Sequence, residues 1–186
     1  MISVREYLNQ VQKLLDEIPE TFIHSLVDDL ERCWRDGKRV LLMGNGGSSA
    51  TASHIVNDLQ KCIALDSGRA LKAACLSDNT PLLMAWANDT EYNNIFAPQV
   101  EAWAEPGDVV IGISGSGNSV NVLNGIEAAN RLGAVTYGMS GYQGGKLASI
   151  AQKSLVVLSD SMQQIEDVHM VALHVVFVQL RQRLAR

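Results

Sequence analysis

The chain has 186 residues, 47% of them hydrophobic, and a formal net charge of -5 at pH 7. This length and apolar content fit a single domain, residues 1–186, with one buried core. The acidic balance, without any run of like charges, disfavours broad binding to nucleic acid or to an anionic membrane surface, because both require concentrated positive charge.

The cysteines and the first residues bear on the cellular compartment. Cys33, Cys62 and Cys75 have neither the paired spacing of a zinc knuckle nor the density of a disulfide scaffold. Residues 1–18 combine acidic side chains with helical periodicity, whereas a signal peptide has a basic start and an unbroken apolar stretch. No apolar run approaches the roughly 20 residues of a membrane helix. We therefore expect a cytoplasmic protein with reduced thiols.

Residues 1–36 are predicted to form an N-terminal helical extension ahead of an α/β core at residues 37–186. Apolar side chains recur at helical spacing from Val4 to about Trp34, and Pro19 interrupts the pattern. This pattern predicts two helices or one kinked helical hairpin.

Five short apolar runs follow, each separated from the next by a segment long enough for a helix. They lie at residues 39–44, 71–76, 108–114, 134–140 and 154–159. Continuous apolar runs are typical of parallel strands that are covered on both faces. The alternation predicts a three-layer α/β sandwich around a mostly parallel, five-stranded sheet. A last helix at about residues 162–185 is apolar on more than one side, which indicates a subunit interface as well as a core contact.

Two loops rich in glycine and serine follow predicted strands. They are GNGGSS at residues 44–49 and SGSGNS at residues 114–119. Ligands of parallel α/β sheets bind at the carboxyl ends of the strands. Small residues, hydroxyls and the amides of a following helix together predict a phosphate cradle. Such loops also occur as plain turns, but two of them at equivalent strand ends favour a ligand site. Neither loop has a nucleotide-binding pattern, so no nucleotide cofactor is expected.

Two helical segments carry three of the four histidines. His54 and Asp58 are four residues apart on the helix after the first loop and share a face. In the last helix, Glu166 and His169 form the obvious local pair, because Glu166 and His174 are about 12 Å apart along the axis. Taken singly, each histidine is more typical of a core residue or of an exposed pair on a helix surface. Their grouping in two segments favours a chemical site. His24 has no such context and is interpreted as structural.

Five motifs in order resemble one family. They are GNGGS followed by a histidine and an acid four residues later, AND at residues 87–89, GDVVIGISGSGNSVNV at 107–122, GGK at 144–146 and IEDVHMVALH at 165–174. On these motifs the chain resembles the sugar isomerase (SIS) domain proteins and, within them, the phosphoheptose isomerases of bacterial heptose synthesis. The resemblance implies a flavodoxin-like fold and a homotetramer with sites near subunit interfaces. It also implies conversion of sedoheptulose 7-phosphate to D-glycero-D-manno-heptose 7-phosphate through an enediol, with one zinc ion per subunit.

The resemblance also implies roles for individual residues. Asp58 would be the base and His174 the acid, and the zinc ligands would be His54, Asp58, Glu166 and His174. The substrate contacts would be Asn45, Gly46, Gly47, Asn88, Asp89, Ser114, Gly115, Ser116, Ser119 and Glu166.

The sequence departs from the family pattern at three positions. Asp58 stands where the family has glutamate, Glu166 where it has glutamine, and Cys62 where it has arginine. Two carboxylates favour a divalent cation and would let Glu166 act as base if the shorter Asp58 cannot reach. The missing arginine removes a phosphate or hydroxyl contact that Lys61 would have to replace, so a different heptose phosphate, made for a capsule or another glycan, stays open.

Two alternatives belong to other functional classes. One is a non-catalytic SIS adaptor that binds the replication initiator, and the other is a phosphosugar-sensing module. A sensing module would usually carry a DNA-binding segment, and none is evident in the sequence. An adaptor has no chemical need for two histidines and two acids beside a phosphate cradle, so these residues favour the isomerase.

Overall fold

The computed structural model describes residues 2–185, in which helices and strands alternate around one sheet. The strands are β1 (Arg39–Gly44), β2 (Lys72–Cys75), β3 (Val109–Ser114), β4 (Val135–Gly141) and β5 (Lys153–Val157). All neighbours pair in parallel, in the order β2-β1-β3-β4-β5. The predicted five-stranded parallel sheet is therefore confirmed.

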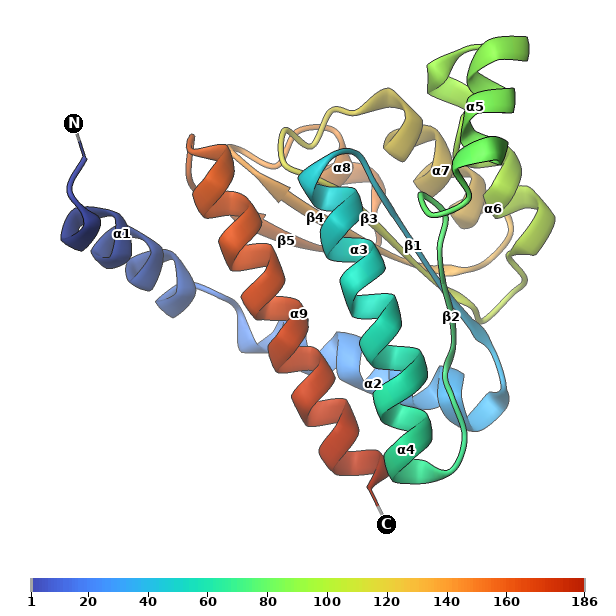
Figure 1. The fold of residues 1–186 in the computed structure, drawn as a ribbon, viewed down its shortest axis with the longest axis horizontal. Helices are drawn as coiled ribbons and strands as arrows, with labels where there is room; N and C mark the ends of the chain where they lie inside the picture. The colour runs from blue at the N-terminus through green and yellow to red at the C-terminus, as the bar shows by residue number, and fades with distance from the viewer. Residues whose placement is uncertain (1, 186) are drawn as a thin grey trace.

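Helices cover both faces of the sheet, which confirms the three-layer sandwich. Figure 1 shows one layer made of α2 (Glu20–Asp36), α3 (Gly47–Asn57) and α9 (Met162–Leu184). The opposite layer contains α5 (Thr80–Asp89), α6 (Ala97–Trp103), α7 (Val120–Arg131) and α8 (Leu147–Ile150). A hydrophobic cluster fills the space between the sheet and each layer.

The apolar strands contribute side chains to both clusters, because successive side chains of a strand point to opposite faces of the sheet. Ile111 and Ile113 of β3 pack into the cluster under α2, α3 and α9, while Val110 packs into the other cluster. All six residues of β3 are buried, as expected of a central parallel strand. The sheet therefore supplies a rigid base whose strand ends hold the loops.

The two N-terminal helices differ in how they attach. In α1 (Val4–Asp16) no residue is fully buried, and the helix stands out from the sandwich in Figure 1. Ser3 and Glu6 cap its start reciprocally, with Ser3 N–H donating to Glu6 Oε2 at 3.0 Å and Glu6 N–H to Ser3 Oγ at 3.1 Å. Helix α2, by contrast, places seven residues in the core and is part of a sandwich layer.

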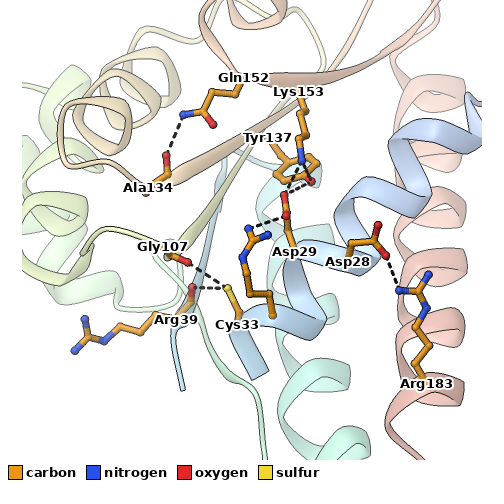
Figure 2. A network of polar contacts seen from close by, with 11 residues as sticks. Asp28, Asp29, Cys33, Arg39, Gly107, Ala134, Tyr137, Gln152, Lys153 and Arg183 are labelled. Atoms are coloured by element: carbon orange, nitrogen blue, oxygen red, sulfur yellow. Dashed lines mark hydrogen bonds and ion pairs between the residues drawn. The ribbon is translucent and has the colours of Figure 1, made fainter. Parts of the chain in front are cut away.

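A network of hydrogen bonds and ion pairs around a buried aspartate connects α2 to the sheet (Figure 2). Asp29 of α2 accepts hydrogen bonds from Tyr137 Oη at 2.6 Å and from Lys153 Nζ at 2.8 Å, and it pairs with Arg32 at 2.7 Å. Burial alone would raise the pKa of Asp29, but the hydrogen bonds from Lys153 and Tyr137 outweigh it and lower that pKa. Burial and the bond to Asp29 raise the pKa of Tyr137. The carboxylate is thus charged and fully partnered.

The helix after β1 changes its pitch partway along. Helix α3 runs into a π-helical turn, η1 (Asp58–Cys62), and then into α4 (Ile63–Ser67), which Gly68 ends with a φ of 78°. Single π turns inside α-helices are frequent at functional sites. No helix within residues 2–185 combines the length and the apolar character that crossing a membrane requires.

Candidate active site

The two predicted ligand loops begin side by side at the carboxyl ends of β1 and β3. These strands are neighbours, with Gly44 in register with Ile113. After β1 the chain passes to α3 on one face of the sheet, and after β3 it passes to α7 on the other. Such a divergence is the topological switch point at which open α/β sheets bind ligands. We call residues 44–49 the first loop and residues 114–119 the second loop.

The first loop brings glycine backbone against a carboxylate of the last helix. Gly46 has φ 55° and ψ -124°, a conformation that side-chain-bearing residues rarely adopt. A Cβ at Gly47 would occupy the space of the Glu166 carboxylate, so Glu166 of α9 lies directly at the start of α3. The positive end of the helix dipole favours a carboxylate there.

The second loop is a hydroxyl-lined turn that opens α7. Ser114 Oγ donates to Ser119 Oγ at 3.0 Å, and the backbone N–H of Asn118 donates to Ser116 Oγ at 3.2 Å. Ser119 precedes the first residue of α7 without capping it through its side chain. The loop therefore leaves hydroxyls and helix amides for an anion.

The predicted GGK segment supports the second loop from outside. Gly117 has φ 66°, and a Cβ there would collide with the carbonyl oxygen of Gly144. Leu147 N–H donates to Gly117 O at 2.9 Å, and Lys146 N–H donates to Asn118 Oδ1 at 3.1 Å. The glycines thus allow two backbone segments to approach closely enough to fix the loop.

Three of the predicted chemical residues converge where α3 and η1 lie beside α9. His54 Nε2 is 2.9 Å from His174 Nε2, and Asp58 Oδ2 is 3.6 Å from His54 Nε2 and 4.0 Å from His174 Nε2. Asp58 begins the π turn, and the two histidine side chains are 47% and 43% exposed. Three donor atoms therefore face one point that solvent can reach.

This trio fits a metal ion, because one donor atom from each of His54, Asp58 and His174 lies within 4.8 Å of the others. Two imidazoles and one carboxylate, with a position left open, form the donor set of catalytic zinc sites. Glu166, the fourth predicted ligand, is not in this group and lies instead against Gly47. The structure thus brings three of the four together and places the fourth beside the first loop.

The predicted Glu166 and His169 pair is wrong. His169 is 1% exposed and points toward the sheet, where its Nε2 is 3.1 Å from the carbonyl oxygen of Ser140. Burial lowers the pKa of His169 to about 4, so the ring is neutral at pH 7. Its Nδ1 has no hydrogen-bond partner among the described residues. His169 is a core histidine, whereas Glu166 lies at the ligand crevice.

Asn88 and Asp89 are at the exposed end of α5. Asn88 Nδ2 donates to Asp89 Oδ1 at 2.8 Å, and no hydrogen bond of the described residues joins either side chain to the two loops. The nearby Tyr92 does reach the first loop, since its hydroxyl donates to Asn45 Oδ1 at 2.8 Å. Asn45 also exchanges two hydrogen bonds with Asn121. Sequence reasoning missed Tyr92 and Asn121, although Asn121 lies inside a motif that it singled out.

The comparisons with known proteins agree with this geometry. The model of the SIS domain family matches residues 6–141. The chain therefore belongs to the SIS domain family. Its relatives include proteins named phosphoheptose isomerase: a probable one from Thermoplasma volcanium is 36% identical over 176 residues, covering 95% of this chain and 89% of the relative. Another, from Aquifex aeolicus, is 45% identical over 141 residues, covering 76% and 73%.

The fold comparison leads to the same group. The phosphoheptose isomerase structure from Neisseria gonorrhoeae superimposes with a TM-score of 0.87 at 27% identity, covering 96% of this chain and 94% of that one. Within the SIS domain family the chain thus groups with the phosphoheptose isomerases, which confirms the resemblance seen in the five motifs.

Proposed function

We propose that the protein is a phosphosugar aldose-ketose isomerase that converts sedoheptulose 7-phosphate to D-glycero-D-manno-heptose 7-phosphate. The observation that carries the proposal is the convergence of His54, Asp58 and His174 beside two ligand loops at the switch point of the sheet. The names of the relatives support a phosphoheptose as the substrate class, and the family resemblance implies sedoheptulose 7-phosphate in particular. A non-catalytic adaptor would not need such a constellation.

The two loops bind different parts of the substrate in this proposal. Glu166 lies at the first loop, so its carboxylate would repel a phosphate dianion bound there. The second loop offers Ser114, Ser116 and Ser119 together with the amides of α7, and we assign the phosphate to it. The sugar chain then runs toward Gly47, Glu166 and the histidines. Further contacts carried over from the family are Asn45, Gly46, Gly115, Asn88 and Asp89.

The proposed chemistry is a pair of proton transfers through an enediol. Asp58 takes a proton from C1 of the ketose, and His174 donates a proton to the carbonyl oxygen on C2. The enediol collapses when C2 regains a proton and O1 loses one, which leaves an aldehyde at C1. His54 lies beside both groups, with Nε2 at 2.9 Å from His174 Nε2. Glu166 would bind the substrate hydroxyls at the first loop.

A zinc ion, one per subunit, is proposed at the trio. His54, Asp58 and His174 would hold it, and its chemistry there would be that of a Lewis acid that polarises the carbonyl oxygen. With the zinc held through His174 Nε2 and one oxygen of Asp58, the proton that His174 gives up would come from its Nδ1, and Asp58 would act as base through its second oxygen. Asp58 stays beside the reacting carbons, and Glu166, outside the converging donors, stays available to the substrate.

A homotetramer in the cytoplasm completes the proposal. Val171, Val175 and Val178 form an outward stripe on α9 and are 38%, 40% and 48% exposed in the single chain. Apolar side chains in a row on one helix face are typical of a protein contact. His174 lies between the first two, so a subunit bound along this stripe would border the site. The free cysteines fit a reducing compartment.

The direct test is turnover of sedoheptulose 7-phosphate by the purified protein. Aldose formation is expected, together with its loss in a chelator and its return on addition of zinc. Activity that persists unchanged after complete metal removal would contradict the zinc assignment alone. No turnover on any heptose or hexose phosphate would overturn the isomerase and favour a binding module.

A further inference from the structure

Two asparagine side chains join the two ligand loops. Asn45 lies in the first loop and Asn121 in the first turn of α7, directly after the second loop. Asn45 Nδ2 donates to Asn121 Oδ1 at 2.9 Å, and Asn121 Nδ2 donates to Asn45 Oδ1 at 3.0 Å. Asn121 is 2% exposed, so water competes little for these bonds. The pair holds the loops in one relative position.

A backbone amide sets which way both carboxamides face. The N–H of Val122 donates to Asn121 Oδ1 at 2.9 Å. Because a backbone N–H can only donate, the atom it meets must be the oxygen of Asn121, and Nδ2 must then face Asn45. Asn121 Nδ2 can only donate, so the Asn45 atom that faces it must be the oxygen. The orientation of Asn121 therefore also determines the orientation of Asn45.

Tyr92 occupies the remaining acceptor position of Asn45. Its hydroxyl donates to Asn45 Oδ1 at 2.8 Å, so that the oxygen accepts from both Tyr92 and Asn121. One of the two Nδ2 hydrogens is bound to Asn121 Oδ1. Among the described residues, the hydrogen-bonding capacity left on the Asn45 side chain is therefore one N–H donor.

The segment that carries Tyr92 is itself hydrogen-bonded to α7. Tyr92 begins the short 3-10 helix η2 (Tyr92–Asn94), and Asn124 Nδ2 of α7 donates to the carbonyl oxygen of Asn93 at 3.1 Å. This segment follows α5, whose end carries Asn88 and Asp89. One amide network thus connects the first loop, the start of α7 and the chain after α5.

We propose that Asn121 and Tyr92 are positioning residues that hold Asn45 as a hydrogen-bond donor toward an oxygen of the substrate. The inference rests on the proposed isomerase function, and it adds a specificity element to that site. A hydroxyl or carbonyl oxygen of the sugar satisfies the free N–H of Asn45. An amino sugar whose ammonium group faced Asn45 would place a donor against the N–H donor of Asn45, so the site would reject it.

The experiment compares two variants with a matched control. Tyr92→Phe removes one hydroxyl from a side chain that is 58% exposed, so folding is unaffected. Asn45 Oδ1 then loses one of its two donors and is held less firmly, so KM and Kd for sedoheptulose 7-phosphate are expected to rise about threefold to tenfold, while kcat stays within about twofold. Asn121→Asp replaces the donor Nδ2 by an oxygen that repels Asn45 Oδ1 and breaks the reciprocal pair, so a rise above about tenfold is expected. Tyr7→Phe removes a tyrosine hydroxyl bonded to Asp167 and should change neither constant.

The outcomes separate this inference from the proposed function. Calorimetry gives Kd independently of turnover, and thermal melting shows whether Asn121→Asp folds; if it does not, Tyr92→Phe decides alone. A Tyr92→Phe variant with the KM and Kd of the parent would overturn the positioning role. A parent protein that binds the sugar phosphate without turning it over would remove the isomerase and leave the Kd comparison decisive. A parent that does not bind it would remove both.

Discussion

Asp58 and Glu166 are the two carboxylates of the site, and the structure gives them different neighbours. Asp58 Oδ2 lies 3.6 Å and 4.0 Å from the two histidine nitrogens, whereas Glu166 lies against Gly47. A carboxylate beside the proposed acid suits proton transfer, and a carboxylate beside the first loop suits hydroxyl binding. The shorter Asp58 therefore keeps the role of base in our proposal.

A pair of isosteric amides tests this division. Asp58→Asn should lower kcat by about 10²- to 10⁴-fold, the usual contribution of a general base. Glu166→Gln should mainly raise KM, because the amide keeps the hydrogen-bonding shape and loses only the charge. Both variants are assayed at saturating zinc, so that weaker metal binding does not mimic loss of the base. A larger fall in kcat for Glu166→Gln would assign the base to Glu166.

The sequence predicted these residues unevenly. Spacing of four on a helix brought His54 and Asp58 together. The axial rise between Glu166 and His174 favoured His169 as the partner of Glu166, whereas the family resemblance placed Glu166 and His174 on one zinc ion. Spacing alone could not tell that His169 faces the sheet. The contacts of Asn45 with Tyr92 and Asn121 span 47 and 76 residues, and no local pattern encodes them.

At the scale of elements, α2 is held to the sheet by both apolar and polar contacts. Its Phe22, Leu26 and Leu30 enter the core, and Asp29 meets Tyr137 of β4 and Lys153 of β5 (Figure 2). Removal of one partner from a buried carboxylate lowers stability, because the charge stays buried with one hydrogen bond fewer.

Two tyrosines allow a matched measurement of this effect. Tyr137 and Tyr7 each donate to an aspartate at 2.6 Å, Tyr137 in the core and Tyr7 at the surface. Tyr137→Phe should lower the free energy of unfolding by about 1.5–3 kcal/mol, the range for a hydrogen bond to a charged group. Tyr7→Phe should cost less than about 1 kcal/mol because water replaces the hydroxyl. Urea denaturation measures both, and equal losses would contradict a buried, charged Asp29.

The strands were the most predictable elements. Each apolar run became a strand within two residues of its expected bounds, because a strand covered on both faces must be apolar throughout. The π turn at Asp58–Cys62 was not predicted. No glycine or proline marks it in the sequence, so neither of the usual local signals of an irregular helix was present.

At the scale of the whole molecule, the valine stripe of α9 bears on assembly. Val175→Asp should reduce the mass measured by analytical ultracentrifugation from four chains to fewer, because the interface would have to bury an unpaired charge. The single chain should keep its fold, since Val175 is 40% exposed. Ser149→Asp, on α8 in the opposite layer, adds the same charge and should leave the mass unchanged. A Val175→Asp protein that remains tetrameric would exclude this stripe as the interface.

The isomerase proposal is tested most directly by incubating the wild-type protein with sedoheptulose 7-phosphate in D₂O and following the reaction by NMR. His54 and His174 are 47% and 43% exposed, so protons held at the site exchange with solvent. The enediol mechanism then predicts an aldose 7-phosphate with deuterium at C2. An aldose whose C2 carries only the hydrogen that left C1 of the ketose would contradict a proton that exchanges with solvent at the trio, and no aldose at all would contradict the isomerase itself.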